Sequence, residues 1–185
     1  MRLAFNAIDA ANDHDPTQVD WKGTLVPKAR LQGELATKWL TRLAPEASNA
    51  VQLAARGHHL RRWAIPRSWH PDGKLGYNRW RAAQKAALAA SFLEVLAPVG
   101  VAEFTISRAT ALAQRVGLGS DPETQRVEDV ACLVFCETDL ADLLDKLGPE
   151  RTLVAIERTT AKMSREAFAL VLAAVPEGPA RALLL

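Results

Sequence analysis

The apolar residues of this chain recur mostly every three or four positions, which is the spacing of one face of a helix. Helices are predicted over residues 2–13 and 27–43, from 45 through the histidines to Pro66, and over 77–96, 101–116, 122–147, 148–163 and 165–174. Residues 17–26 and 68–76 are predicted as loops, and no alternating run is long enough to predict a strand. The pattern therefore predicts an all-α fold: a single domain of seven or eight helices over residues 1–175, with a C-terminal tail at 176–185.

Composition narrows the class of protein. The 185 residues are 49% hydrophobic, which is enough for one ordinary core. A formal net charge of +2 argues against bulk nucleic-acid binding, and no apolar run approaches the ~20 residues of a membrane span. The N-terminus turns acidic too early for a signal peptide. Cys132 and Cys136 are expected to be buried and free, so a reducing, cytoplasmic setting is predicted.

The stretch AARGHHLRRWAIPR, residues 54–67, concentrates titratable and cationic side chains at a predicted helix end. If the helix continues to Pro66, His58 lies beside Arg62, and His59 lies beside Trp63, because residues four apart share a face. Such a helix end suits a bound anion, or a metal with a phosphate. A solvated helix end with one packed histidine is the alternative.

A second polar group lies at the end of the first predicted helix. Asp9, Asn12 and Asp15 precede or flank Pro16, where carboxylates oppose the helix dipole. They either bind a metal or another cation, or form an Asx-type turn that ends the helix at Pro16.

Two carboxylates enter the most apolar helix. Residues 130–136 are apolar on every side, which predicts a helix buried all round, and Glu128 and Asp129 precede them directly. A buried carboxylate must be paired, hydrogen-bonded or metal-bound. We expect both to face the His58–Arg62 region, either as catalytic groups or in a structural ion pair with Arg61 or Arg62.

Taken together, five segments resemble the domain-of-unknown-function family 4202: residues 4–16, 54–67, 76–81, 127–135 and 162–164, the last reading KMS. They follow the family's order and spacing, but residues 29–37 and Leu88-Ala89 depart from its usual pattern, so the chain looks like a divergent member. The resemblance brings no activity. More loosely, the arrangement is similar to the all-α metal-dependent phosphohydrolases of the HD superfamily, with His58-His59 in place of a His-Asp pair and Asp129 as the later acid.

These residues suit phosphoester chemistry. If His58 or His59 and Asp129 bind one divalent ion, the mixed ligands favour Mn, Fe, Co, Ni or Zn over Mg. The ion would activate a water and polarise a phosphoryl oxygen, with Glu128 and Asp129 as catalytic residues. The side chains predicted to hold the phosphate or to stack on a base are Arg61, Arg62, Trp63, Arg67, Tyr77, Trp80, Arg81 and Lys162.

Three interpretations remain open from sequence. The first is a metal-dependent phosphohydrolase acting on a nucleotide or another small phosphoester. The second is a non-catalytic binding or regulatory domain that holds a small anionic ligand at the same His/Arg/Trp face. The third is a polar network that only ties helices together.

Overall fold

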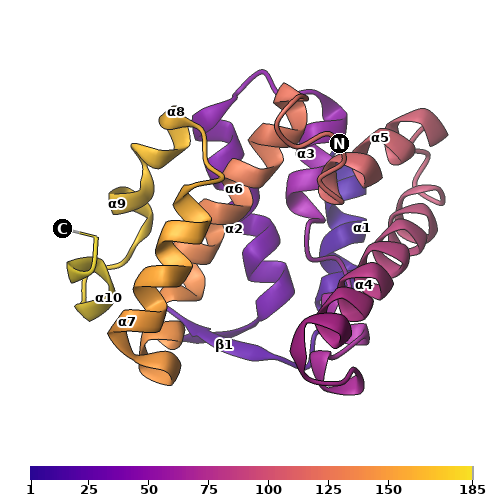
Figure 1. Cartoon of the computed structure of the whole chain (residues 1–185). Coiled ribbons are helices and arrows are strands. Elements are labelled where there is room, and N and C mark those ends of the chain that lie inside the picture. Colours follow the sequence, from indigo (N-terminus) through magenta and orange to yellow (C-terminus); the bar gives the residue numbers. More distant parts are fainter. Residues whose placement is uncertain (185) are drawn as a thin grey trace.

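A computed structural model describes residues 1–184 and is built almost entirely from helices (Figure 1). The longer helices are α1 (Arg2–Asn12), α2 (Lys28–Leu43), α3 (Asn49–Arg56), α4 (Gly73–Leu96), α5 (Glu103–Ala113), α6 (Pro122–Thr138) and α7 (Leu140–Thr160). The one-turn helices are α8 (Arg165–Phe168), α9 (Val171–Ala174) and α10 (Pro179–Ala182), and two 3₁₀ turns, η1 (Arg62–Ala64) and η2 (Arg67–Trp69), precede α4. The prediction of a single all-α domain is confirmed.

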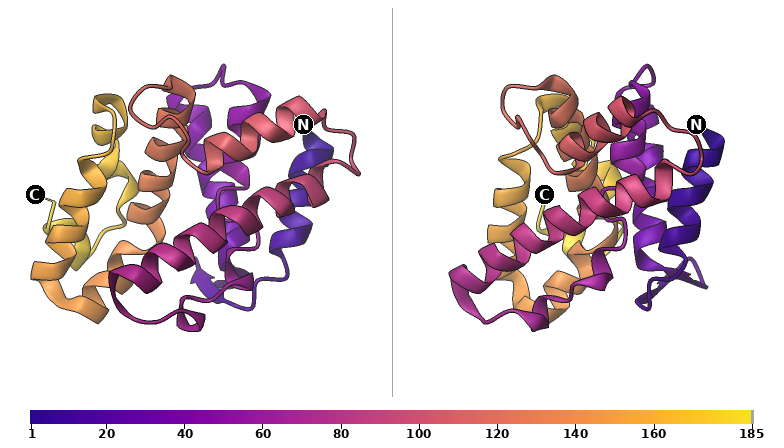
Figure 2. Two further views of the ribbon diagram at one scale, coloured as in Figure 1. Left: turned by 45° about the vertical axis from the view of Figure 1, so that its right-hand side comes forward. Right: turned by 90° about the vertical axis from the view of Figure 1, so that its right-hand side faces the viewer.

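Helix α6 lies at the centre of the fold, and α2, α3, α7 and α9 pack against it (Figures 1 and 2). It begins at Pro122 because the Asp121 carboxylate caps it, accepting from the backbone N–H of Glu123 at 2.9 Å. Its middle is buried as predicted, and Leu133 has no exposed surface. On the other side of the molecule, α4 packs on α1 and on α5, and α1 and α5 each pack on α3.

The two cysteines are free and buried in α6, as expected. Burial raises the pKa of the Cys132 thiol to about 12 and that of Cys136 to about 11, so both stay protonated.

A short hairpin replaces the first predicted loop. Strands β1 (Gln18–Trp21) and β2 (Thr24–Pro27) pair antiparallel, with Trp21 opposite Thr24. Lys22 and Gly23 both have positive φ, 56° and 81°. They form a two-residue turn whose backbone twist matches the right-handed twist of the two flanking strands. The expectation of no strand was therefore wrong here, because four-residue strands are too short to show alternation.

Several helix boundaries also differ from the prediction. Helix α3 ends at Arg56, so His58 and His59 lie in a turn, and the expected pairings of His58 with Arg62 and of His59 with Trp63 on one helix were wrong. Helix α4 begins at Gly73 rather than 77, and a break at Asp139 separates α6 from α7.

Two further boundaries concern the C-terminal third. The predicted boundary at Gly148 is present as a kink inside α7, where that residue has φ 76° and ψ 172°. The predicted tail contains α10, whose Ala180 is buried, and its last residue, Leu185, lies outside the described residues.

Candidate functional site

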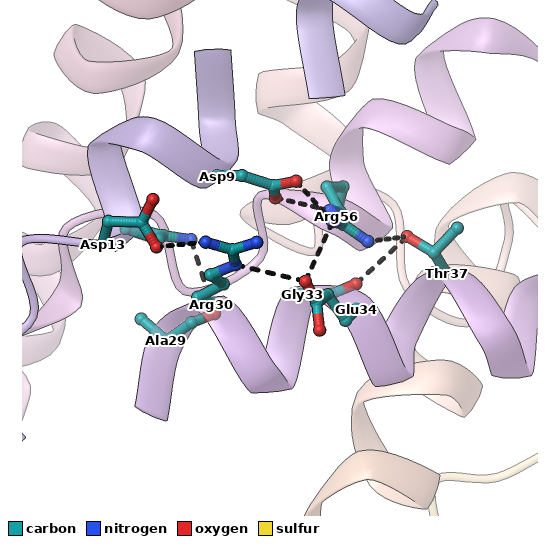
Figure 3. Close-up of polar contacts among 9 residues, drawn as sticks. Asp9, Asp13, Ala29, Arg30, Gly33, Glu34, Thr37 and Arg56 are labelled. Atoms are coloured by element: carbon teal, nitrogen blue, oxygen red, sulfur yellow. Dashed lines mark hydrogen bonds and ion pairs between the residues drawn. The ribbon is translucent and has the colours of Figure 1, made fainter. Parts of the chain in front are cut away.

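The turn that carries both histidines follows Arg56, the last residue of α3, whose polar contacts are drawn in Figure 3. The Arg56 guanidinium donates two hydrogen bonds to Asp9 of α1, at 2.7 and 2.5 Å, and a third to the Thr37 hydroxyl of α2 at 3.3 Å. Gly33 lets α2 pass close to this end, since a Cβ there would lie 2.5 Å from the Arg56 carbonyl oxygen. Three helices are thus joined two residues before His58.

Hydrogen bonds define the tautomers of both histidines. His58 Nδ1 lies 2.8 Å from the Ala55 carbonyl oxygen, and His59 Nδ1 lies 2.6 Å from the side-chain oxygen of Gln32. Because these oxygens only accept, each Nδ1 carries the proton in the neutral ring, and each Nε2 presents a lone pair. Within residues 1–184, His58 Nε2 is buried without a partner.

The Gln32 amide is itself held in place. Its Nε2 donates to Asp139 Oδ2 at 3.0 Å, which leaves Oε1 facing His59. Asp139 is also paired with Lys28 and accepts from the Thr138 hydroxyl at 2.7 Å. This chain of contacts fixes the His59 ring from its Nδ1 side, so Nε2 is the ring nitrogen left to meet a ligand.

Both imidazoles are neutral at pH 7. Burial, reinforced by the positive charge of Arg115, lowers the pKa of His58 to about 4. Burial also holds the pKa of His59 well below its usual value, with further lowering by His58 and Arg62. The two rings lie with their centroids 4.2 Å apart.

His59 and Arg62 line two cavities. The larger, of about 620 Å³, includes Trp63, Trp80 and Phe135, and we call it the aromatic cavity. The smaller, of about 300 Å³, we call the basic cavity, and its charged lining residues are Arg62, Arg81, Lys85, Arg115, Lys162 and Glu128. A molecule that contacts both His59 and Arg62 would therefore lie where the two cavities meet.

The basic cavity is strongly positive. Five cationic side chains face one carboxylate, that of Glu128. Glu128 is paired with Arg115 at 2.6 Å, and Lys162 approaches it at 3.9 Å. The remaining positive charge favours an anionic ligand.

Arg62 is the most exceptional cation of the site. It is half-buried, yet no residue of the described chain forms a hydrogen bond or ion pair with its guanidinium. The guanidinium lies over the Trp80 ring, 4.8 Å from the centroid, and burial together with Arg81 lowers its pKa. A planar fork of donors without a partner is ready for a bidentate anion.

Some of this site was missed by the sequence analysis. Arg115 has a left-handed φ of 64° and donates to the Ala113 carbonyl at 2.7 Å, so its side chain is held against Glu128. In the sequence, Arg115 is the second-to-last residue of the helix predicted over 101–116, and it belongs to no motif. Gln84, Lys85 and Gln114 also line the cavity, but they lie among alanine-rich or short segments without a motif.

Four other predicted residues line the aromatic cavity, one of them Asp15 of the acidic group at the first helix end. The other three are Trp63, Arg67 and Trp80. Trp80 Nε1 donates to the Ile65 carbonyl at 2.9 Å, and Arg67 donates to the carbonyls of His70 and Pro71 at 2.7 and 2.9 Å. Arg67 therefore supports the loop, while the Arg62 guanidinium covers one face of the Trp80 indole.

Apart from the acidic group at the first helix end, three predicted site residues line neither cavity. Asp129 is fully buried and faces Ser164 instead of the histidines. Arg61 pairs with Glu94 at 2.7 Å, and Glu128 pairs with Arg115, so the alternative of a structural ion pair with Arg61 or Arg62 was wrong. Tyr77 is exposed, 5.8 Å from the Trp80 ring.

The acidic group at the first helix end does not converge on one point. Asp9 binds Arg56, and Asn12 Oδ1 accepts from the backbone N–H of Arg61 at 3.2 Å. Asp15 accepts from the N–H groups of Thr17 and Ala29, both at 2.9 Å. The turn alternative holds in this form, although α1 ends at Asn12 rather than at Pro16.

Protonation of His58 is expected to destabilise the fold at low pH. The unfolded chain takes up this proton near pH 6.5 and the folded chain near 4, so stability is lost as pH falls through that window. Between pH 7 and 5 the free energy of unfolding should fall by about 2 kcal/mol from His58 alone. Urea unfolding of the wild type and of His58→Gln at both pH values measures this, with His14→Gln as the control. An equally steep pH dependence in His58→Gln would contradict the assignment.

The chain was compared with protein families, curated proteins and solved structures. The family described as "Domain of unknown function (DUF4202)" matches residues 2–184. No curated protein and no solved structure matches. Among the described residues, no helix is long and apolar enough to cross a membrane.

Proposed function

This chain belongs to the DUF4202 family, and we propose that it binds a small phosphate-bearing molecule where the basic and aromatic cavities meet. The observation that carries the proposal is the half-buried guanidinium of Arg62, which lines both cavities and has no hydrogen-bond or ion-pair partner among residues 1–184. A guanidinium that is partly withdrawn from water and has open donors interacts more strongly with an anion than a fully solvated one does, so an anion is the natural occupant. We also propose a cytoplasmic setting, which the protonated, unpaired cysteines favour.

Cavity size and lining support the same ligand class. A volume of about 620 Å³ suits a molecule of metabolite size. The phosphate would lie against Arg62 on the side of the basic cavity, and Trp63 and Trp80 would pack against the rest of the molecule.

Replacing Arg62 with glutamine should weaken phosphate binding. Charge-assisted hydrogen bonds contribute about 1.5–3 kcal/mol each, so affinity for inorganic phosphate and pyrophosphate should fall roughly tenfold to a hundredfold. Isothermal calorimetry measures this. Arg79→Gln is the control, because Arg79 is an exposed arginine of α4 that lines neither cavity. Equal affinities in wild type and Arg62→Gln would overturn the proposal.

A metal-dependent phosphohydrolase at the same residues is the second candidate. It is favoured by the Nε2 atoms of His58 and His59, two neutral imidazole nitrogens that no described residue engages. Against it stands the excess of cationic side chains, which repels a divalent cation. Within residues 1–184 no group of three or more His, Cys, Asp or Glu side chains is placed to hold a metal ion.

Elemental analysis of protein purified without chelator tests this second candidate. If it is correct, the wild type should carry nearly one equivalent of Mn, Fe, Co, Ni or Zn, and His59→Ala should lose it. A wild type that is metal-free and takes up none of these ions on titration would contradict the hydrolase.

A further inference from the structure

We propose that the bound molecule is a hydroxyl-bearing phosphate monoester of the sugar-phosphate type, with a ligand hydroxyl donating to His59 Nε2. This inference rests on the proposed function and specifies its ligand. Its basis is the set of hydrogen-bond acceptors that line the site beside the cations.

The first acceptor is His59 itself. Its Nδ1–H is committed to Gln32, so its Nε2 offers a lone pair, and no described residue donates to it. His59 lines both cavities next to Arg62. The site therefore combines the free N–H donors of the Arg62 guanidinium with a free acceptor, His59 Nε2.

The second set consists of two amides in the basic cavity. Gln84 Nε2 donates to the carbonyls of Arg62 and Ile65, both at 2.8 Å, and Gln114 Nε2 donates to the Lys85 carbonyl at 2.8 Å. Each amide has its NH₂ group engaged with backbone, so its Oε1 is the end left to accept. No residue within the described range donates to either oxygen.

The third acceptor is His58 Nε2, which lies deeper. The His58 side chain is 6% exposed, and this nitrogen has no partner among residues 1–184. An unpaired buried acceptor is uncommon in folded proteins and usually marks a missing donor.

These acceptors distinguish between ligands. A phosphate group alone presents mainly lone pairs at pH 7, so it can satisfy Arg62 but leaves His59 and the two glutamines unmatched. A metal ion would match the lone pairs, but the surrounding cations oppose it. Hydroxyl groups supply donors without adding positive charge, and a sugar phosphate carries several of them beside its phosphate.

The test compares two phosphate monoesters of matched charge and length, ribose 5-phosphate and pentyl phosphate, on the full chain by calorimetry. Ribose 5-phosphate is expected to bind about threefold to tenfold more tightly, the usual gain from a hydrogen bond to a neutral group. His59→Phe should remove part or all of this preference, measured as the ratio of the two dissociation constants, whereas His14→Phe, in an exposed position, should leave that ratio unchanged.

The outcomes separate the two proposals. Equal binding of both esters by the wild type overturns the hydroxyl inference and leaves phosphate binding standing. Failure of both esters and of inorganic phosphate to bind overturns the proposed function as well. If His59→Phe does not fold, the ¹⁵N resonance of His59 Nε2 in the wild type decides: ribose 5-phosphate should shift it and pentyl phosphate should not, and equal shifts would contradict the inference.

Discussion

Asp9→Ala is expected to lower the free energy of unfolding by about 2–3 kcal/mol, although Asp9 lies outside both cavities. The Asp9 and Arg56 side chains are only 17% and 11% exposed, and they form a two-bond ion pair (Figure 3). Removing the carboxylate leaves a buried guanidinium whose remaining side-chain contacts are Thr37 at 3.3 Å and Glu34 at 3.7 Å. Stranding one partner of a buried pair costs more than the pair contributes.

Chemical unfolding in urea measures the effect, and the chain offers a matched control. Asp13, one helical turn from Asp9, pairs with Arg30 at 2.6 Å, but both side chains are about two-fifths exposed. Asp13→Ala should therefore cost well under 1 kcal/mol. The double variant Asp9→Leu/Arg56→Leu should recover part of the loss, since it strands no charge. Equal destabilisation by Asp9→Ala and Asp13→Ala would show that burial of the pair is not what matters.

The Asp9–Arg56 ion pair also explains why the sequence pattern predicted the histidines to lie on a helix, although they lie in a turn. The apolar periodicity of α3 continues without a visible stop toward Pro66, and Gly57 alone is a weak break. In the structure α3 ends at Arg56, where it meets α1 and α2, and Arg61 takes a left-handed φ of 51° shortly after. These are tertiary contacts between residues 47 apart, which local pattern does not reveal.

Strong local signals were reliable. Asp121-Pro122 starts α6, and Ser164 caps α8, because a cap depends on residues only two or three positions away. Part of the lining of the candidate site was predictable as well: six of the predicted residues line the basic cavity, namely His58, His59, Arg62, Arg81, Glu128 and Lys162. The side chains that hydrogen-bond to these residues lie on other elements, as Gln32 does for His59 and Arg115 for Glu128. Such pairings could not be predicted from one sequence.

Asp129 shows how a buried carboxylate can look functional in sequence. It was expected to face the histidine stretch because it enters an apolar helix. In the structure it is fully buried and accepts from Gln125 Nε2 at 2.9 Å, from the Ser164 N–H at 2.8 Å and from the Ser164 hydroxyl at 2.7 Å. These bonds tie α6 to the start of α8, where Ser164 is also the N-cap. The carboxylate oxygens are thus already engaged.

Asp129→Ala should therefore act on stability, with a loss of about 3–5 kcal/mol in the free energy of unfolding. The variant leaves the Ser164 N–H and the Gln125 amide short of a partner next to the core, and it weakens the start of α8. Urea unfolding followed by circular dichroism measures this, with Asp145→Ala as control, because Asp145 is an exposed acid of α7 that lines neither cavity. If Asp129→Ala instead kept wild-type stability but lost metal or phosphate binding, Asp129 would belong to the functional site, and the contacts with Ser164 would have to rearrange when the ligand binds.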